Sequence, residues 1–329
     1  MEVGLLLLVV LFLVLVAEFI NGWTDAPNAI ATVVSSGVLP PKIAVPIAVV
    51  LNAAGATAGT AVAATIGKGI VEASSVTVAS IAAAMIAIIA WGMFAAHKGI
   101  PVSKSHALLA GIAGAAVAGG GFEALIMGGW TKVGIGLFAS ILCGFFGAYL
   151  LGKIITFIGE RTPPSQSKKV ADVLQVLSAS SMAFNHGLND GQKFIGVFTL
   201  VLVLGGVLET FHIPYWVVLV CAATMGLGTA LGGWRIIMTI GKKLTAIKSW
   251  QGFAAETAAS TTIFFASQFG IPLSTTHTIT SAVAGASSSR RVRDVRWGVF
   301  RNIFMAWVLT FPICGLLAYG AALLANAVF

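Results

Sequence analysis

Long apolar stretches separated by short polar ones run along the whole chain, and its two halves show the same alternation. About 20 consecutive apolar residues suffice for a helix to cross a bilayer, whereas the strands of a membrane barrel show shorter, alternating patterns. The apolar segments of the first half cover residues 3–37, 43–66, 76–97, 104–120 and 130–158. Those of the second half cover residues 173–208, 213–240, 250–268, 275–288 and 302–328. The pattern predicts an all-α integral protein of the cell (inner or plasma) membrane.

The clearest sign of duplication is a motif that occurs once in each half. Residues 99–115 read GIPVSKSHALLAGIAGA and residues 270–286 read GIPLSTTHTITSAVAGA, with eight of seventeen positions identical. We therefore expect two structural repeats, at residues 1–158 and 172–329, joined by the polar linker 159–171. Each repeat should contain a broken helix followed by a re-entrant helical hairpin.

The positions of the basic residues predict how the repeats are oriented. When the segments flanking each Gly-Ile-Pro turn back as hairpins, thirteen Lys and Arg residues fall on one side of the membrane and only Lys68 and Lys132 on the other. The side rich in Lys and Arg is normally cytoplasmic. Each half then crosses the membrane an odd number of times, so the second repeat is inverted relative to the first. We expect both termini outside, the linker inside, and the hairpin tips near the middle of the membrane.

Composition agrees with this class of protein. Hydrophobic residues make up 58% of the chain and charged residues 9%, with a mean hydropathy of +0.98, whereas a soluble domain carries about 25% charged residues. The net charge of +8 lies in short loops. We attribute it to orientation and to contact with anionic lipid, and we expect no nucleic-acid partner. The three cysteines stand singly, without the spacing of a metal or redox site.

The two hairpin tips are predicted to bind an anion. Proline cannot continue a preceding helix and disfavours helix at the residue before it, so a new helix begins just after each Gly-Ile-Pro. A helix N-terminus offers unpaired N–H groups and a partial positive charge, and nearby hydroxyls add donors. The predicted anion ligands are Ser103, Lys104, Ser105, Ser274, Thr275 and Thr276. The competing interpretation is that these hydroxyls only cap the helices.

Three further residues near the tips have open roles. His106 and His277 follow in the first helical turn, and we expect them to brace the tips by hydrogen bonds, with metal ligands or proton carriers as the alternative. Glu256 lies in the first arm of the second hairpin, where the first repeat has Met85. It either completes a cation site or braces a tip.

The first apolar segment of each half contains an acidic break. Residues 19–25 read FINGWTD and residues 184–190 read FNHGLND. An ionised carboxylate inside a membrane is costly and usually functional, and carboxylate, amide and carbonyl oxygens suit a hard cation. We therefore predict a sodium site at each break. As alternatives, Asp25 and Asp190 titrate and carry protons, or pair with Lys193 or a histidine for structural reasons.

Together the motifs resemble those of the inorganic phosphate transporter (PiT) family. The resemblance rests on the two Gly-x-x-Asp breaks, the second within HGLNDGQK, and on the twin Gly-Ile-Pro-x-Ser-x-Ser/Thr-His tips, and it spans essentially the whole chain. It implies secondary transport of phosphate in a duplicated inverted fold, with phosphate contacts in both tips. It implies cation and substrate roles for Asn21, Asp25, Asn28, Asn185, Asn189 and Asp190.

On this basis we assign Asn28 and Gln192 to phosphate and add Thr24 to the sodium ligands, the other sodium ligands being Asn21, Asp25, Asn185, Asn189 and Asp190. Thr24 and Lys104 depart from the family, which usually has Asn and Thr at these positions. The first departure bears on one cation site and the second on the charge preference for the anion.

The combined prediction is a sodium-coupled phosphate symporter that works by alternating access. A proton-coupled phosphate or sulfate permease is the nearest alternative, and a passive anion channel is the alternative of another class. No enzyme is expected, because no nucleophile turn of the Gly-x-Ser-x-Gly type accompanies the Ser, His and Asp residues. The expected partners are inorganic phosphate, sodium and membrane lipid, without an organic cofactor, and a homo-oligomer is left open.

Overall fold

The computed structural model describes residues 2–159 and 163–328, and it builds both halves from the same succession of helices. The first half contains α1 Glu2–Thr24, η1 Ala26–Ala29, α2 Ala31–Ser35, α3 Pro41–Thr57, α4 Ala61–Lys68, η2 Ala73–Ser75, α5 Val78–Lys98, α6 Lys104–Gly120, η3 Phe122–Ala124 and α7 Met127–Gly159. The second contains α8 Pro164–His186, the π-helical η4 Gly187–Gly191, α9 Gln192–Leu204, α10 Tyr215–Ala230, α11 Trp234–Met238, the π-helical η5 Thr239–Leu244, α12 Ser249–Gln268, α13 Thr275–Ser288, η6 Val292–Asp294 and α14 Trp297–Val328. No strand occurs in these ranges.

Several of these helices are suited to a membrane. Five are long and apolar enough to cross one, or up to seven when each bent pair is counted as a single span. Their outer faces carry exposed apolar side chains such as Phe138, Phe146 and Leu324. A helix satisfies its own backbone hydrogen bonds, as lipid requires. The predicted helical integral membrane protein is confirmed.

Both predicted breaks are present, but each half also has a bend that we did not predict. Residues 43–66 form two helices, α3 and α4, which meet at 67°, and α10 meets the α11–η5 segment at 63°. The second bend coincides with Gly232 and Gly233, of which Gly232 has φ +58°. Glycine adopts this left-handed conformation without a side-chain clash. The adjacent glycines therefore mark a turn inside an apolar run.

Residues 164–171 of the predicted linker are helical. Residues 160–162 lie outside the described residues, and α8 begins at Pro164. Proline is well placed at the start of a helix because its missing N–H would lack a partner there. The boundaries at 158 and 172 remain predictions.

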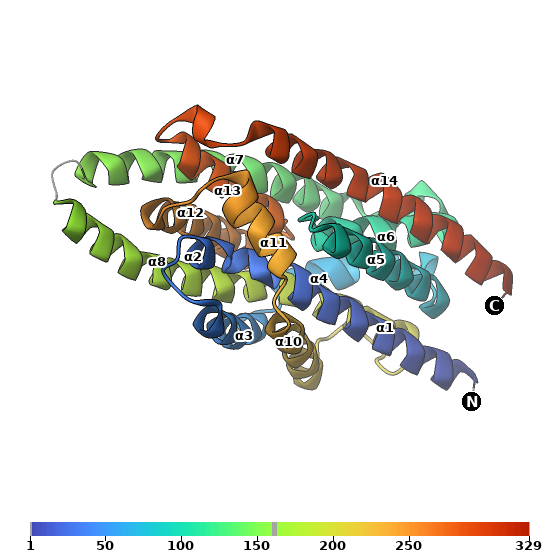
Figure 1. Cartoon of the computed structure of the whole chain (residues 1–329). Coiled ribbons are helices and arrows are strands. Elements are labelled where there is room, and N and C mark those ends of the chain that lie inside the picture. Colours follow the sequence, from blue (N-terminus) through green and yellow to red (C-terminus); the bar gives the residue numbers. More distant parts are fainter. Residues whose placement is uncertain (1, 160–162, 329) are drawn as a thin grey trace.

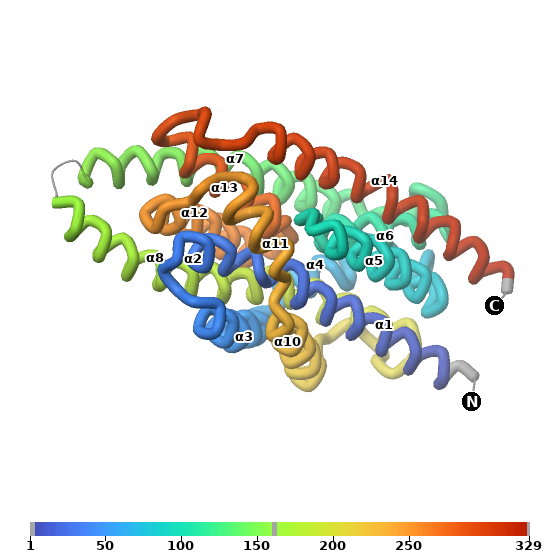
Figure 2. Tube along the Cα trace, in the orientation of Figure 1, coloured from blue at the N-terminus to red at the C-terminus, as the bar shows by residue number. Residues whose placement is uncertain are grey.

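Each hairpin packs against the last long helix of the other half. The α5–α6 hairpin lies along α14, and the α12–α13 hairpin lies along α7 (Figures 1 and 2). A Cβ atom at Gly114 of α6 would lie 2.2 Å from the Gly315 carbonyl oxygen of α14, and one at Gly285 of α13 would lie 2.0 Å from the Phe145 carbonyl oxygen of α7. Small residues let membrane helices approach this closely. Both termini lie at one end of the molecule in Figure 1.

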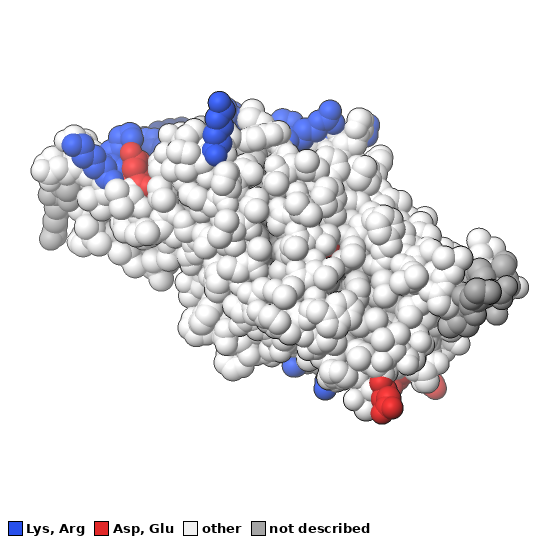
Figure 3. Space-filling model, turned by 90° about the horizontal axis from the view of Figure 1, so that it is seen from below, with Lys and Arg blue, Asp and Glu red and all other residues white. Residues whose placement is uncertain are grey.

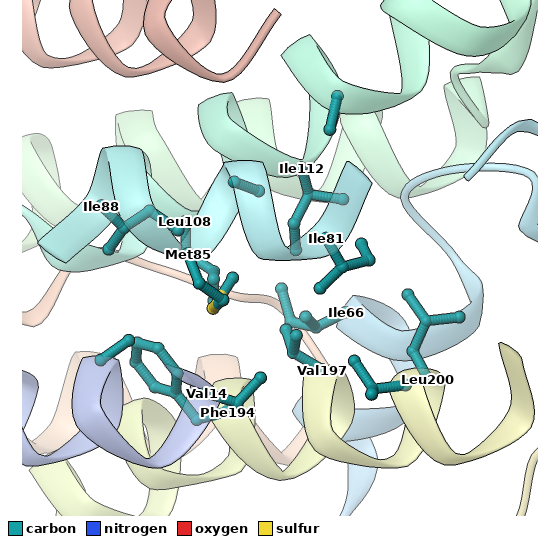
Figure 4. Packing of buried hydrophobic residues seen from close by; sticks show 14 of the residues in the cluster. Val14, Ile66, Ile81, Met85, Ile88, Leu108, Ile112, Phe194, Val197 and Leu200 are labelled. Atoms are coloured by element: carbon teal, nitrogen blue, oxygen red, sulfur yellow. The ribbon is translucent and has the colours of Figure 1, made fainter. Parts of the chain in front are cut away.

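Two apolar clusters support the helices around the tips. One joins α1, α5, α6 and α9 and includes Val14, Met85, Leu108 and Phe194 (Figure 4). The other joins α2, α8, α12 and α13. Lys and Arg gather along one edge of the face seen in Figure 3, and a smaller group lies at the opposite edge together with acidic side chains. This distribution agrees with the unequal split that we inferred from the loops.

Candidate functional site

Both hairpin tips have the local geometry that the sequence predicts. The first arms end at glycines with left-handed backbones, Gly99 at φ +67° and Gly270 at φ +63°. Ser103 caps α6, because its hydroxyl accepts a hydrogen bond from the His106 amide at 3.2 Å. Ser274 caps α13 in the same way, accepting from the His277 amide at 3.2 Å. The capping interpretation thus describes these two serines, while the next side chains in each tip turn to other partners.

Asp25 receives donors from both tips. The Thr276 hydroxyl of the second tip donates to Asp25 Oδ2 at 3.1 Å. From the first tip, the Lys104 amide approaches the same oxygen at 3.4 Å, and Lys104 Nζ lies 3.5 Å from Oδ1. Asn28 Nδ2 donates to the Thr276 hydroxyl at 3.0 Å. The first acidic break is therefore bonded to both hairpins.

Asp190 is bonded in the corresponding manner. The Thr275 hydroxyl of the second tip donates to its Oδ2 at 2.8 Å, and the Ser105 hydroxyl of the first tip donates to its Oδ1 at 3.4 Å. Lys193 Nζ donates to Asp190 Oδ1, to the Ser105 hydroxyl and, at 2.7 Å, to the Leu273 carbonyl oxygen. The structure brings both tips and both breaks into one cluster, as we predicted.

The cluster is buried and its charges are matched. Asp25, Lys104, Asp190 and Lys193 are each no more than 2% exposed. Buried charges in proteins are normally paired in this way, since an isolated charge in an apolar medium is very unfavourable. The pairing of Asp190 with Lys193 was one of our structural alternatives, and the structure contains it alongside the bonds to the tips.

Three residues bonded into this cluster, His186, Asn52 and Lys193, were not predicted as site residues. His186 Nε2 lies 3.2 Å from Asp190 Oδ2, and its Nδ1 lies 2.7 Å from Asn52 Oδ1. Asn52 is a lone amide within the apolar segment 43–66, and this isolation was the available sequence signal. Lys193 carried a similar signal, since a cation beside a buried Asp is itself expensive in a membrane.

Several buried oxygens around the breaks lack a donor in the part of the chain that the structure describes, and three of them belong to the predicted sodium ligands Asn21, Asn185 and Asn189. Among the described residues, no hydrogen-bond donor reaches the side-chain Oδ1 atoms of Asn21, Asn28, Asn185 and Asn189, or Glu18 Oε1. Their amide groups are engaged: Asn189 Nδ2 donates to the Ser267 hydroxyl at 2.8 Å, and Asn185 Nδ2 donates to the Ser260 hydroxyl at 2.9 Å. A buried acceptor without a donor is unfavourable. Oxygen atoms of this kind fit a hard cation.

Thr24 and Gln192 occupy different surroundings. The Thr24 hydroxyl donates to the Ile20 carbonyl at 2.7 Å and lies 3.5 Å from Asp25 Oδ1. Gln192 does not join the tips: its Oε1 accepts from the Val62 amide at 2.9 Å, which caps the start of α4, and its Nε2 donates to the Leu188 carbonyl at 2.6 Å. Gln192 therefore links the second break to α4.

The two histidines contact each other through their rings. Their centroids lie 4.4 Å apart, and His277 stacks on Trp307 of α14 at 3.8 Å. Within the described part of the chain, neither ring nitrogen of His277 has a hydrogen-bond partner. His277 braces the second tip by stacking, where we had predicted hydrogen bonds. Trp307 also donates to the Pro101 carbonyl at 3.0 Å, so the same indole contacts the first tip.

Glu256 lies outside the tip cluster. It is fully buried, and its two carboxylate oxygens accept hydrogen bonds from Thr32 of α2 and Ser178 of α8. These bonds join the first arm of the second hairpin to the segments beside both breaks. Both roles that we left open for Glu256, completing a cation site or bracing a tip, remain predictions.

Comparison with known proteins identifies the family. The model of the phosphate transporter family matches residues 21–318. A probable low-affinity inorganic phosphate transporter of Rhizobium meliloti (strain 1021) is 42% identical over 303 residues, which cover 92% of this chain and 91% of the relative. A protein of the same name from Bacillus subtilis (strain 168) is 38% identical over 330 residues, which cover 99% of each chain.

A solved structure described as "The sodium-dependent phosphate transporter" has the same fold. It matches with a TM-score of 0.81 at 23% identity, over 98% of this chain and 100% of that one. The names of the family and of its members describe transporters, which confirms that the chain is not an enzyme. The chain belongs to the phosphate transporter family.

Proposed function

We propose that this protein is a sodium-coupled phosphate symporter that works by alternating access. One observation carries the proposal: Asp25 and Asp190 each accept hydrogen bonds from both hairpin tips. The groups suited to holding an oxyanion are thus bonded to the two carboxylates.

Phosphate must compete with the carboxylates for these donors. When phosphate accepts bonds from Ser105, Thr275 and Thr276, the two Asp side chains lose these hydroxyl donors and keep Lys104 and Lys193. The buried site then holds an added negative charge and carboxylate oxygens with fewer donors, which is unfavourable without a compensating cation. A cation bound by the Asp oxygens restores the balance. Binding of phosphate and binding of a cation therefore favour each other, which is the thermodynamic requirement for symport.

Sodium is the cation that we propose. Each Asp carboxylate stands in a break that also carries donor-free amide oxygens, those of Asn21 in the first and of Asn185 and Asn189 in the second. Such oxygens favour a hard metal ion. The described structural relative is named as sodium-dependent, which supports the same choice. In this scheme Asn28 contacts phosphate through its place beside Thr276.

We further propose that the halves are inverted repeats in the cell membrane with both termini outside. The support is the matched succession of broken helix, bent pair, hairpin and long final helix in the two halves. Broken helices at the middle of the membrane, one from each repeat, are a recurrent design of substrate sites in transporters.

Purified protein in liposomes tests the coupling ion. We expect uptake of radiolabelled phosphate to follow an inward sodium gradient and to be lost when choline replaces sodium. Uptake that ignores sodium but follows an imposed pH step would reject sodium and establish the proton-coupled alternative. Competition by sulfate and arsenate in the same vesicles determines which oxyanion is preferred.

Counterflow separates a carrier from a passive anion channel. Vesicles preloaded with unlabelled phosphate should take up labelled phosphate faster than empty vesicles, because a carrier returns more readily when loaded. Equal rates in loaded and empty vesicles would indicate a channel.

A further inference from the structure

Each hairpin tip is held by a threonine from the other half of the chain. The Thr65 hydroxyl of α4 donates to the Gly270 carbonyl of the second tip at 2.8 Å. The Thr239 hydroxyl of η5 donates to the Gly99 carbonyl of the first tip at 2.8 Å. The two threonines are 7% and 6% exposed. Gly99 and Gly270 are the matching first residues of the duplicated motif, so the same bond is made twice with the halves exchanged.

Glycine is needed at both acceptor positions. Both residues have left-handed backbones, which other residues adopt only with strain. A Cβ atom at Gly270 would lie 2.9 Å from the Ala61 carbonyl oxygen, and one at Gly99 would lie 3.1 Å from Arg235 Cβ. The tips thus approach the opposing segments as closely as a backbone allows.

Each threonine has a second acceptor in its own helix. The Thr65 hydroxyl lies 3.3 Å from the Ala61 carbonyl oxygen, and the Thr239 hydroxyl lies 3.0 Å from the Arg235 carbonyl oxygen. A hydroxyl has one proton to donate, so it can return to its own helix when the tip moves away. Releasing the tip then leaves no donor unsatisfied, and the free-energy cost is lower than for an ordinary buried hydrogen bond.

The second hairpin tip borders an open pocket on one side and the candidate site on the other. On one side, a pocket of about 430 Å³ is lined by Thr65, Lys68, Lys132, Gln268 and Gly270, among others. On the other side, the same tip accepts hydrogen bonds from the site through the carbonyls of residues 271 and 273. Moving this tip would connect the pocket, with its two lysines, to the anion ligands.

We propose that Thr65 and Thr239 form a pair of gating latches, each holding the hairpin tip of the other half closed over the site from one side of the membrane. Both bonds are present together in this structure, in which Asp25 and Asp190 are no more than 2% exposed. The inference rests on the proposed alternating access, and it assigns the movement to two hydroxyl groups outside the phosphate and sodium ligands. Arg235 also donates to the His97 carbonyl, so the Thr239 latch has a second bond.

Cysteine probes on the tips test the latches. Val102 and Leu273 directly precede the two capping serines and are buried, so Val102→Cys and Leu273→Cys report opening of each tip in a background with Cys143, Cys221 and Cys314 replaced by alanine. Thr65→Val and Thr239→Val remove each hydroxyl at nearly constant volume. A membrane-impermeant thiol reagent is added to either side of sealed vesicles, without phosphate.

We expect Thr65→Val to speed modification of Leu273→Cys about two- to threefold from the face that carries Lys68, the low end of the range for one hydrogen bond, because the hydroxyl has an alternative acceptor in its own helix. Thr239→Val should speed modification of Val102→Cys from the opposite face, by a smaller factor because Arg235 still holds that tip. Thr65→Ser, which keeps the hydroxyl, should restore the original rate. Thr199→Val is the matched control, since among the described residues the acceptor of this buried threonine lies in its own helix, the Ile195 carbonyl at 2.8 Å.

Unchanged rates of thiol modification in both valine variants, or faster modification from the same face at both probes, would contradict the proposal that Thr65 and Thr239 are gating latches. If a valine variant is not monodisperse in detergent, the alanine variant at the same position makes the same comparison. Opening at opposite faces in a protein that fails to carry phosphate would instead reject the proposed function and leave the latches in place.

Discussion

Asp25 and Asp190 link the chemistry of the site to its geometry, because each carboxylate is the meeting point of two hairpins and one lysine. Both side chains are buried, so water cannot replace a lost partner. A change at either position therefore alters both the charge of the site and the position of the tips. Substitutions at these two residues therefore test the coupling mechanism most directly.

Removing one of the two carboxylates should abolish coupled transport. Asp25→Asn and Asp190→Asn keep the size of the side chain but remove the charge that we propose to hold sodium. We expect sodium-driven phosphate uptake, normalised to the amount of folded protein in the vesicles, to fall to background in each variant. Asp172→Asn is the control, since Asp172 forms a surface ion pair with Lys168 at 2.5 Å and such pairs contribute little. Normal uptake in both site variants would remove the cation-site assignment.

The buried ion pair between Asp25 and Lys104 makes a second prediction. Removing one partner of a buried pair costs about 3–5 kcal/mol, because the other charge is left uncompensated. Asp25→Asn and Lys104→Gln should each lower the unfolding temperature in detergent, and the double variant should be less destabilised than the sum of the two. A coupling of about 2 kcal/mol is expected in the double-mutant cycle. Strict additivity would show that the two charges do not interact.

The sequence predicted the members of the site better than their individual roles. Carboxylates and hydroxyls inside apolar segments are conspicuous because the membrane makes them expensive, and this singled out Asp25, Asp190 and the two tips. The same rule does not say which polar atoms bond to each other. Gln192 was assigned to phosphate but caps α4, and His277 stacks on an indole, because both depend on neighbours distant in the sequence.

At the scale of whole elements, close packing of each hairpin on a long helix sets the position of the tips. Gly114 and Gly285 hold matching places in α6 and α13, and each lies against the backbone of a helix from the other half. Their lack of a side chain lets α14 and α7 come near enough to support the hairpins. The sequence showed the small residues but not which helix they would contact.

Enlarging these glycines should displace the hairpins. Gly114→Val and Gly285→Val place a side chain where a carbonyl lies 2.2 Å and 2.0 Å away, and overpacking of this kind costs about 1–3 kcal/mol. We expect a smaller monodisperse fraction in detergent and slower phosphate uptake. Gly320→Val in α14 and Gly134→Val in α7 are matched controls, since no atom of the described residues lies within 4 Å of a Cβ atom at either position. Equal losses in all four variants would refute this role.

Considered as a whole, the molecule binds its two proposed ligands through one shared set of groups. The donors that would hold phosphate are the partners of the carboxylates that would hold sodium. Binding of either ligand therefore changes the affinity for the other. By thermodynamic linkage, the two effects must be equal in size.

Calorimetry in detergent measures this linkage. We expect phosphate to bind about 5- to 150-fold more tightly in sodium than in choline, the range typical of coupled sites. Phosphate should strengthen sodium binding by the same factor. Asp25→Asn should reduce the factor towards one. An identical phosphate affinity in sodium and choline would contradict the exchange of donors that we derive from the structure.

The architecture was only partly predictable from the chain. The repeated motifs predicted two similar halves. The lengths of the apolar segments predicted helices, because a segment in lipid must satisfy its own backbone hydrogen bonds. The bends before Ala61 and Trp234 were missed, since the turns there interrupt runs that remain apolar. The packing of each hairpin on a helix of the other half was missed as well, because this contact depends on the three-dimensional arrangement and leaves no local sequence pattern.

The packing of each hairpin on a helix of the other half has a consequence for biosynthesis. The hairpin at residues 78–120 leaves the ribosome long before its support, residues 297–328, so it must wait in the bilayer until those residues have been synthesised. Neither half alone contains both a hairpin and the helix on which that hairpin rests. Two separately synthesised halves should consequently be unstable apart and should assemble only in each other's presence.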